Sequence, residues 1–550
     1  MKAKERYLKM ERLEPKFIYT ITHYNKQQFL KDILSGIIVA IIALPLNIAF
    51  ALGAGVSPEK GVYAAIISSI ICGFLGGSRV QISGPTGAFI VITQSVVAGY
   101  GLNGLAVAML IAGIILILLG VFRLGRMVRF IPAPITTGFT AGIGVTIFTL
   151  EIKDFLGLSP ESMPTKFVEK WAYYLSHLKE ANIQSVLLAL VCIVILVIWP
   201  KINKTIPNSL IAIIVGTLAA YFLKLDVKLL GEIPKSLGSP IVPEMNLQMI
   251  IDLISPGFTI AVLIAMQALL SAVVTDGIIN SRTNSNMELI AQGLSNIVLA
   301  FFGCIPTTGG VARGVQSAKN GARTPIAAVV HSIMLFLFLI ALMPLLKMIP
   351  LCVLASILIV VSYNMLNVKV LIGYLKAPKS DLLVLVASCV LTFAFDLVFA
   401  IEVGMILSLA LFMKRMADVT EVKAWKNIED GTKYDLDLKV VPEGCAVYEI
   451  NGPLFFGAVD VLKKIVADEK KNSLIIRMRG VSAIDATAMD YLNTLYEDCK
   501  HKKIQLAFSH VNEQPLALMK KNGFYAKVGV ENFCMHIDAA IKRAEAIDGI

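Results

Sequence analysis

Long apolar runs, separated by Gly, Pro and short basic loops, fill most of this sequence and limit what it can fold into. The runs are roughly 15 to 23 residues long, which is what an α-helix needs to cross ~30 Å of hydrocarbon. Only 16% of the residues are charged, whereas ordinary soluble domains contain about 25%. We therefore predict a polytopic α-helical membrane protein with most of its mass in lipid.

The apolar runs predict about fourteen membrane spans, two of them short. An even number of spans places both ends of the chain on one side of the membrane. The short loops on that side are rich in Lys and Arg, among them Arg123, Arg126 and Arg129, which predicts that both termini of this multi-pass cell-membrane protein are cytoplasmic. The predicted spans are 33–52, 61–76, 86–98, 104–122, 133–150, 183–199, 208–223, 257–279, 289–303, 311–320, 324–342, 350–364, 381–395 and 398–413.

The net charge of +11 has the same explanation, because many basic residues stand in residues 1–32 and in loops beside apolar runs. The charge therefore does not indicate a nucleic-acid partner. Residues 1–32 are charged throughout, so we expect a cytoplasmic N-terminal segment and not a secretory signal peptide. We recognise no nucleophile triad, metal-ligand spacing or phosphate loop, and we expect neither an enzyme nor a cofactor or metal.

A weak internal repeat relates two parts of the membrane region. The segment ISGPTGAF at 82–89 is echoed by CIPTTGGVAR at 304–313, and each joins an extended Pro/Gly stretch to a short apolar run. The offset between Thr86 and Thr308 also brings the starts of other predicted spans close to one another. We predict two halves of seven spans each. Because seven is odd, the halves enter the membrane in opposite orientation, as in many secondary transporters.

Paired short segments interrupted by Gly and Pro mark the binding site in such transporters. The first backbone N–H groups of each short helix lack intrahelical partners, and the helix dipole places about half a positive charge there. Two facing helix starts would therefore hold an anion. The residue types fit, because glycines allow close backbone approach, prolines keep the approaches extended and threonines offer hydroxyls. These residues are Gly84, Gly87, Gly309, Gly310, Pro85, Pro306, Thr86 and Thr308.

Arg313 is the most informative residue of this site. It falls in the first turn of the second short helix, where its charge adds to the helix dipole. An intramembrane charge costs at least about 2.5–3.5 kcal/mol on insertion scales, so an anion nearby would explain it. Pairing with Asp276 or Glu288, or extension to the membrane surface, is the alternative.

The eighth span has an amide, Gln267, near its middle. Its carboxylate, Asp276, lies nearer the cytoplasm. Cation or proton coupling through the position of Gln267 is therefore not expected. Ser271, one turn further, either joins a polar cluster with Gln267 or is simply packed. The pair Gly138 and Gly142 forms a small-xxx-small surface that favours helix packing over ligand contact.

Taken together, the membrane region resembles the sulfate permease family, also called solute carrier family 26. The stretches LPLNIAFALGAGVSPEKGVYAAI, ISGPTGAF, NMELIAQGLSN and NGARTPIAAVVHS carry the resemblance, in the order of that family. It implies a uracil-permease-like fold with core and gate domains, an anion held between the third and tenth spans, and an elevator-like movement of the core. Ser271 and Asp276 would support binding indirectly or take part in coupling. The expected anion-binding residues are Phe50, Thr86, Gly87, Ala88, Gln267, Thr308, Gly310, Val311, Ala312 and Arg313.

Three positions depart from the family pattern. Leu46 follows Pro45 where many relatives have Gln, and Ala312 stands where animal members have Ser. Gln267 stands where members coupled to sodium or protons carry Asp or Glu. Together these residues count against sodium-driven bicarbonate import and against proton symport.

The composition changes at Lys414, where the membrane region 33–413 gives way to a charged linker, 414–439. In 440–550, strand-like segments such as VYEINGPLFF and SLIIRMRG alternate with helical ones, which predicts a soluble α/β domain. This domain resembles the sulfate transporter and anti-sigma-factor antagonist (STAS) domain, which implies a four- to five-stranded sheet with helices on one side.

The loop VSAIDATAMDYL carries the STAS resemblance. Asp485 is followed by Ala486 where free-standing antagonists carry a phosphorylatable serine, so serine phosphorylation at that place is excluded. Asp485 and Thr487 would form a regulatory loop, with Thr487 expected as a helix cap. We expect the domain to support a homodimer or to bind a cytoplasmic protein partner.

The leading hypothesis is secondary transport or exchange of a small inorganic or organic anion, with sulfate, chloride, bicarbonate and dicarboxylates as candidates. A membrane-embedded anion sensor or signalling scaffold that acts through the STAS domain is the alternative. Nucleobase transport on the related uracil-permease fold is disfavoured by Arg313 and by the C-terminal domain.

Overall fold

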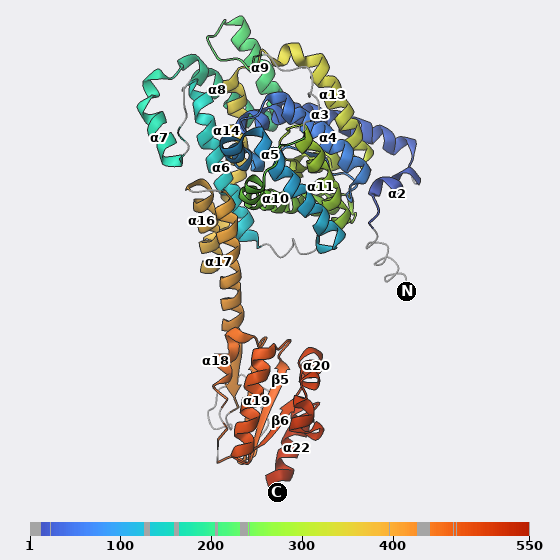
Figure 1. Cartoon of the computed structure of the whole chain (residues 1–550), viewed down its shortest axis with the longest axis vertical. Coiled ribbons are helices and arrows are strands. Elements are labelled where there is room, and N and C mark those ends of the chain that lie inside the picture. The colour runs from blue at the N-terminus through green and yellow to red at the C-terminus, as the bar shows by residue number, and fades with distance from the viewer. Residues whose placement is uncertain are drawn as a thin grey trace. The chain divides into compact units, whose positions relative to one another are not determined.

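The computed structural model describes residues 13–22, 24–125, 132–158, 164, 166–203, 207–231, 240, 242–394, 397–425, 441–465, 467–468 and 470–548. The chain divides into two compact units, Met1–Met405 and Ile406–Ile550 (Figure 1), each described here by itself. Some predictions lie outside the described residues: those on Arg126, Arg129, residues 1–12 of the N-terminal segment and residues 426–439 of the linker.

The first unit is built of helices, as predicted. Within the described ranges, seven helices are long and apolar enough to cross a membrane by length and composition. The total of about fourteen spans stays a prediction. The helices are α2 (Lys16–Thr22), α3 (Lys26–Gly53), α4 (Pro58–Leu75), α5 (Ile90–Val121), α6 (Ala133–Leu156), α7 (Phe167–Ser176), α8 (Ile183–Ile202), α9 (Asn208–Phe222), α10 (Leu247–Ile279), α11 (Ser285–Phe301), α12 (Val311–Lys319), α13 (Ile326–Leu346), α14 (Leu351–Leu366), α15 (Val368–Tyr374), α16 (Lys379–Ala394) and α17 (Leu397–Asp418), in which the boundary between the units falls.

Helix α5 takes up most of two predicted spans, 86–98 and 104–122. A single turn of 3-10 helix, η1 (Gly87–Phe89), precedes it. At Gly101 the backbone has a φ of 67° and leaves the helical conformation, a geometry that glycine adopts without the steric cost of a side chain. The kink at Gly101 therefore separates a short segment that starts at η1 from a longer one.

The helices of the first unit pack in two groups, which we call the core group and the gate group. The core group consists of α3, α4, α5, α10, α11, α12 and α13, and the gate group of α6, α7, α8, α9, α14 and α16. Glycines allow close packing within the gate group. A Cβ on Gly138 would lie 2.2 Å from the carbonyl oxygen of Leu385, and one on Gly142 would lie 2.5 Å from Cβ of Thr392. Both contacts are on α16, which confirms that the Gly138 and Gly142 surface serves helix packing.

Two short strands cross inside the core group. Strand β1 (Ser83–Gly84) pairs with β2 (Thr308–Gly309) in antiparallel fashion. Side chains from neighbouring helices hold them, because Ser69 Oγ donates to the carbonyl of Ser83 (2.6 Å) and Asn296 binds both backbone groups of Thr307 (2.9 and 3.0 Å). The antiparallel register brings the two repeated segments together in opposite directions, as an inverted repeat requires.

The second unit contains a five-stranded sheet in the order β3–β4–β5–β6–β7. β3 is antiparallel to β4, and every other neighbouring pair is parallel. The segments VYEIN and SLIIRMRG form β4 and β5, as predicted. The strands are β3 (Glu421–Ala424), β4 (Cys445–Asn451), β5 (Ser473–Gly480), β6 (Gln505–Ser509) and β7 (Phe533–Cys534); the helices are α18 (Val459–Leu462), α19 (Ala486–His501), α20 (Glu513–Lys521), α21 (Phe524–Val528) and α22 (Ile537–Asp548).

The prediction of helices on one side of this sheet is wrong. Leu474 and Ile476 of β5 face a core shared with α19, α20 and α21, whereas Ile475 faces the opposite side. There α22 covers the sheet with the apolar stripe Ile537, Ala540, Ile541 and Ala544, whose spacing matches one face of a helix. Successive residues of a strand point to opposite faces, so the apolar run in β5 fits a sheet covered on both sides.

Candidate functional site

The two repeated segments meet in the antiparallel pair of β1 and β2, with η1 following β1 and α12 following β2. Thr86 stands just before η1, and Gly310 is the extended residue just before α12. Both threonine hydroxyls turn toward α10: Thr86 Oγ1 donates to Gln267 Oε1 (3.0 Å), and Thr308 Oγ1 donates to the carbonyl of Ile264 (3.0 Å). Helix α10 therefore fixes the position of both helix starts.

The side-chain amide of Gln267 is available to donate hydrogen bonds. Its Oε1 accepts the hydroxyl of Thr86, and among the described residues no protein group accepts a hydrogen bond from its Nε2. The side chain is half-buried. An amide held in this way presents N–H groups, which suit an anion, and offers no carboxylate for a cation.

Arg313 lies in the first turn of α12 and is only 8% exposed. Its Nη2 donates to the carbonyl of Pro85 (2.6 Å) and its Nη1 to Oδ1 of Asn47 (3.4 Å). Glycines make room for it, because a Cβ on Gly84 would lie 2.1 Å from Nη1 and one on Gly310 would lie 2.7 Å from Nε. The backbone of Gly84 and that of Gly310 therefore lie against the guanidinium, in space that a side chain would fill.

The carboxylates considered as partners of Arg313 have other partners. Asp276 accepts the backbone N–H of Thr283 (2.6 Å) in the turn after α10. Glu288 accepts the N–H groups of Gly77 (2.9 Å) and Ser78 (3.1 Å) and the Gln292 amide (3.0 Å). Within the described part of the chain, no ion pair joins Arg313 to either carboxylate. Among the described residues, the guanidinium is therefore a buried positive charge whose hydrogen-bond partners are neutral.

The other predicted site residues differ in how open they are. Thr86, Val311 and Ala312 keep exposed surface at the helix starts, whereas Phe50, Ala88, Thr308 and the glycines Gly87 and Gly310 are buried. Ser271 is buried where α10 meets α12, and a Cβ on Gly314 would lie 3.3 Å from its Oγ. The structure thus places Ser271 beside the first turn of α12, and Asp276 in the last turn of α10, where it caps the loop that follows.

The start of η1 faces the gate group. A Cβ on Gly87 would lie 3.6 Å from Cε1 of Phe50, 3.3 Å from Sδ of Met365 in α14 and 3.5 Å from Cδ1 of Ile147 in α6. Sequence reasoning missed Met365 and Ile147, which carry no polar signal. It also missed Asn47, although an amide within an apolar run two residues after Pro45 is a signal that could have found it.

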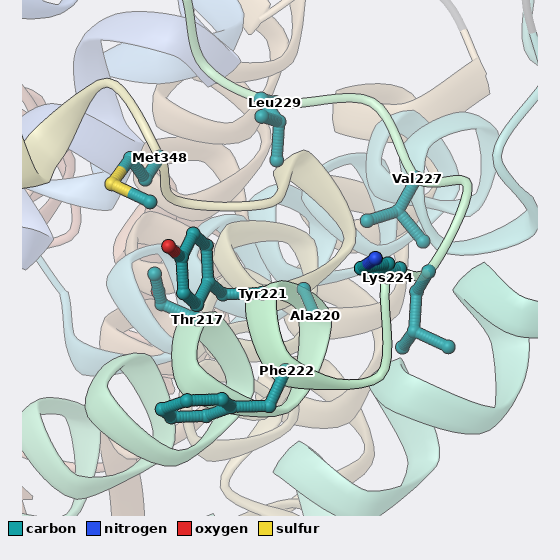
Figure 2. A pocket seen from close by; sticks show the side chains of 9 residues that line it. Thr217, Ala220, Tyr221, Phe222, Lys224, Val227, Leu229 and Met348 are labelled. Carbon is teal, nitrogen blue, oxygen red and sulfur yellow. The ribbon is translucent and has the colours of Figure 1, made fainter.

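A separate pocket of about 460 Å³ lies at the end of α9 and the loop that follows (Figure 2). None of the predicted site residues lines it. In the described residues no group of three His, Cys, Asp or Glu side chains could hold a metal ion. The pocket lining includes Tyr221, Phe222, Lys224, Leu229 and Met348.

The STAS-like loop has a different cap from the predicted one. Asp485 caps α19, because its Oδ1 accepts the N–H of Ala488 (2.9 Å) while Oδ2 accepts the N–H of Phe456 (2.9 Å). Thr487 lies inside the first turn of α19 and is exposed. The prediction of Thr487 as the cap is wrong. Helix α19 begins at Ala486, so Asp485 is the residue before the helix, and its carboxylate accepts the backbone N–H groups of Ala488 and Phe456.

Comparison with known proteins agrees with this architecture. The model of the Sulfate permease family matches residues 29–388, and the model of the STAS domain matches residues 438–540. The putative sulfate transporter YvdB of Bacillus subtilis is 35% identical over 523 residues, which cover 94% of this chain and 98% of that protein. The bicarbonate transporter BicA of a Picosynechococcus species is 27% identical over 540 residues, covering 93% and 94%.

Solved structures share the fold. The murine solute carrier 26 family member A9 matches with a TM-score of 0.88 at 21% identity, over 97% of this chain and 94% of that one. The transmembrane domain of a cyanobacterial BicA matches with a TM-score of 0.61 at 25% identity, over 70% of this chain and 98% of that one. The helical unit and the α/β unit thus define a multi-pass membrane transporter with a STAS domain. The chain belongs to the sulfate permease family, whose members are transporters and not enzymes.

Proposed function

We propose that this chain carries a small anion across the membrane, bound between the starts of η1 and α12. The observation that supports this most is Arg313, a buried guanidinium whose hydrogen-bond partners, Pro85 and Asn47, are both neutral. A buried charge without a counter-charge is costly, and an anion at the helix starts would supply one. The N–H groups of η1 and α12 and the Gln267 amide would complete its hydrogen bonds.

The shape of the site favours a small ligand. A Cβ on Gly87 would already meet Phe50, Ile147 and Met365 within 3.6 Å, so there is little room for a bulky ligand beside the start of η1. Relatives are named as transporters of sulfate and bicarbonate and as anion exchangers. We take sulfate, chloride, bicarbonate and dicarboxylates as the candidates for this chain.

An elevator-like mechanism fits the two groups of helices. The anion site belongs to the core group, and the gate group touches it through Ile147 and Met365. Movement of the core group along the gate group would carry the bound anion across. We further propose cytoplasmic termini, about fourteen spans, a membrane domain 33–413 joined by linker 414–439 to a STAS domain 440–550, a homodimer and a cytoplasmic partner for the STAS domain.

The test is anion flux into liposomes that contain the purified full-length protein, measured with a panel of labelled anions. Arg313→Ala should weaken transport about ten- to a hundredfold, because a hydrogen bond to a charged group contributes about 1.5–3 kcal/mol. Arg323→Ala is the matched control, since Arg323 is exposed and its Nη1 donates to the carbonyl of Ala318 (2.9 Å). Equal transport by both variants would remove Arg313 from the site.

Deletion of residues 430–550 separates transport from the anion-sensor alternative. If flux persists in the shortened protein, transport belongs to the membrane unit. Absence of flux in the full-length protein, under every anion and gradient, would favour the sensor.

A further inference from the structure

Glu151 is a buried carboxylic acid of the membrane unit that the proposed anion site does not use. It lies near the end of α6 and is 6% exposed. Among the described residues, none donates a hydrogen bond to its carboxyl oxygens and none forms an ion pair with it. Lys153, two residues further on, pairs with Asp154 (3.6 Å). Burying an ionised carboxylate without partners is costly, so the charge of Glu151 must be neutralised by a bound proton or cation.

The position of Glu151 relates it to the anion site. A Cβ on Gly53 would lie 3.3 Å from Oε1 of Glu151 and at the same distance from Cδ1 of Ile90 and Cδ1 of Leu358. Gly53 ends α3 one turn after Phe50, and Ile90 opens α5 directly after η1. The carboxyl group of a gate helix therefore lies beside the end of α3, close to the start of α5, and both elements carry the proposed anion site of the core group.

The surroundings favour a proton over a metal cation. A Cβ on Gly53 would meet Oε1 together with two methyl groups, and among the described residues no group of three His, Cys, Asp or Glu side chains could supply the several oxygen ligands that a hard cation requires. The charged neighbours on α6 are Lys153 and Asp154. From other elements, Tyr174 of α7 donates to the carbonyl of Thr149 (2.9 Å), and Lys228 approaches Asp154. Helix α14, the end of α3 and the start of α5 contain no charged residue.

We propose that Glu151 is a proton-binding site that must be occupied when the core and gate groups close over it, so that protons activate anion transport. This inference rests on the proposed function. In the open arrangement the carboxylate meets water and is ionised; closure against Gly53 and Ile90 requires its O–H bond to form, and reopening returns the proton to water. A bare carboxylate beside Gly53, which follows Phe50 by one turn of α3, would also repel the anion. Intramembrane carboxyl groups are typical of proton pathways.

The proton site proposed at Glu151 differs from the position of Gln267, where proton coupling is not expected. Gln267 is an amide and takes no proton at physiological pH, so coupling through its position stays unexpected. Glu151 belongs to the opposite group of helices and acts on their closure.

The first experiment measures anion flux in proteoliposomes as a function of pH for the wild type, Glu151→Gln and Asp154→Asn. Wild-type flux should rise as the pH falls, by up to about tenfold per pH unit for a single proton. Glu151→Gln mimics the protonated acid and should transport at the wild type's low-pH rate at every pH. Asp154→Asn removes the neighbouring carboxylate, which is 25% exposed, and should keep the wild-type profile.

The second experiment needs no variant. The O–H of a protonated carboxyl group in apolar surroundings adds across a C=N bond of dicyclohexylcarbodiimide: the proton goes to nitrogen, the oxygen bonds the central carbon, and the adduct rearranges to a stable N-acylurea. At neutral pH this reagent should therefore modify Glu151 more than Asp154, as mapped by mass spectrometry. Flux that is independent of pH, a pH-dependent Glu151→Gln variant, or equal labelling of the two acids would overturn the inference and leave the proposed function standing. Absence of wild-type flux at every pH would overturn both.

Discussion

Replacing Gly84 with alanine should displace the guanidinium of Arg313 without removing its charge. The new Cβ would lie 2.1 Å from Nη1 and 3.0 Å from Cζ, whereas optimal carbon contacts lie at about 3.5–4.0 Å. The guanidinium must therefore retreat by roughly 1 Å or more, which breaks its 2.6 Å hydrogen bond to Pro85. If the anion loses one charge-assisted contact of about 1.5–3 kcal/mol, its apparent affinity falls about ten- to a hundredfold.

The assay is the KM for uptake of a transported anion into proteoliposomes, with the rate at saturating anion measured in parallel. Gly99→Ala in α5 is the control, because a Cβ on Gly99 would meet no described atom within 4 Å. We expect a raised KM in Gly84→Ala and a wild-type KM in Gly99→Ala. A KM in Gly84→Ala equal to that of the control would show that the position of the guanidinium does not matter for binding.

Three further predictions concern packing and capping within each of the two units. Asp485→Ala removes the cap of α19 and should lower the unfolding free energy of the STAS domain by about 0.5–2 kcal/mol, measured by denaturant titration; an unchanged midpoint would contradict the capping role. Gly142→Val should overpack the α6–α16 contact and cost about 1–3 kcal/mol, seen as a lower melting temperature of the detergent-solubilised protein. Burial raises the pKa of Cys499 to about 11, so maleimide should label this thiol at neutral pH only after unfolding, and rapid labelling of the native protein would count against its burial.

The helical membrane unit follows from the sequence because the length and composition of an apolar run decide whether it can cross a bilayer. The paired segments around Thr86 and Thr308 could be found for the same kind of reason, since Gly and Pro interrupt a run visibly. The helices on both faces of the STAS sheet were harder to predict. Apolar residues such as Ile475 and Ala507 are compatible with a sheet covered on one face and with a sheet covered on both. The contact with α22 shows that their face is covered.

The proposed anion site shows which contacts the sequence could not predict. Arg313 could be singled out because a charge at membrane depth is rare and costly. Its partners could not, because Asn47 and Pro85 reach it through the packing of α3 and β1 against α12, contacts between residues far apart in the chain. The same holds for Glu151, which in the sequence stands beside Lys153 and Asp154 like any charged helix end. Packing of its carboxyl group beside Gly53 of α3 makes it a buried acid. A charge therefore acquires a role from what surrounds it. Under the proposed movement of one helix group along the other, the surroundings of Glu151 would change, and this change would link a proton at Glu151 to an anion held near Phe50.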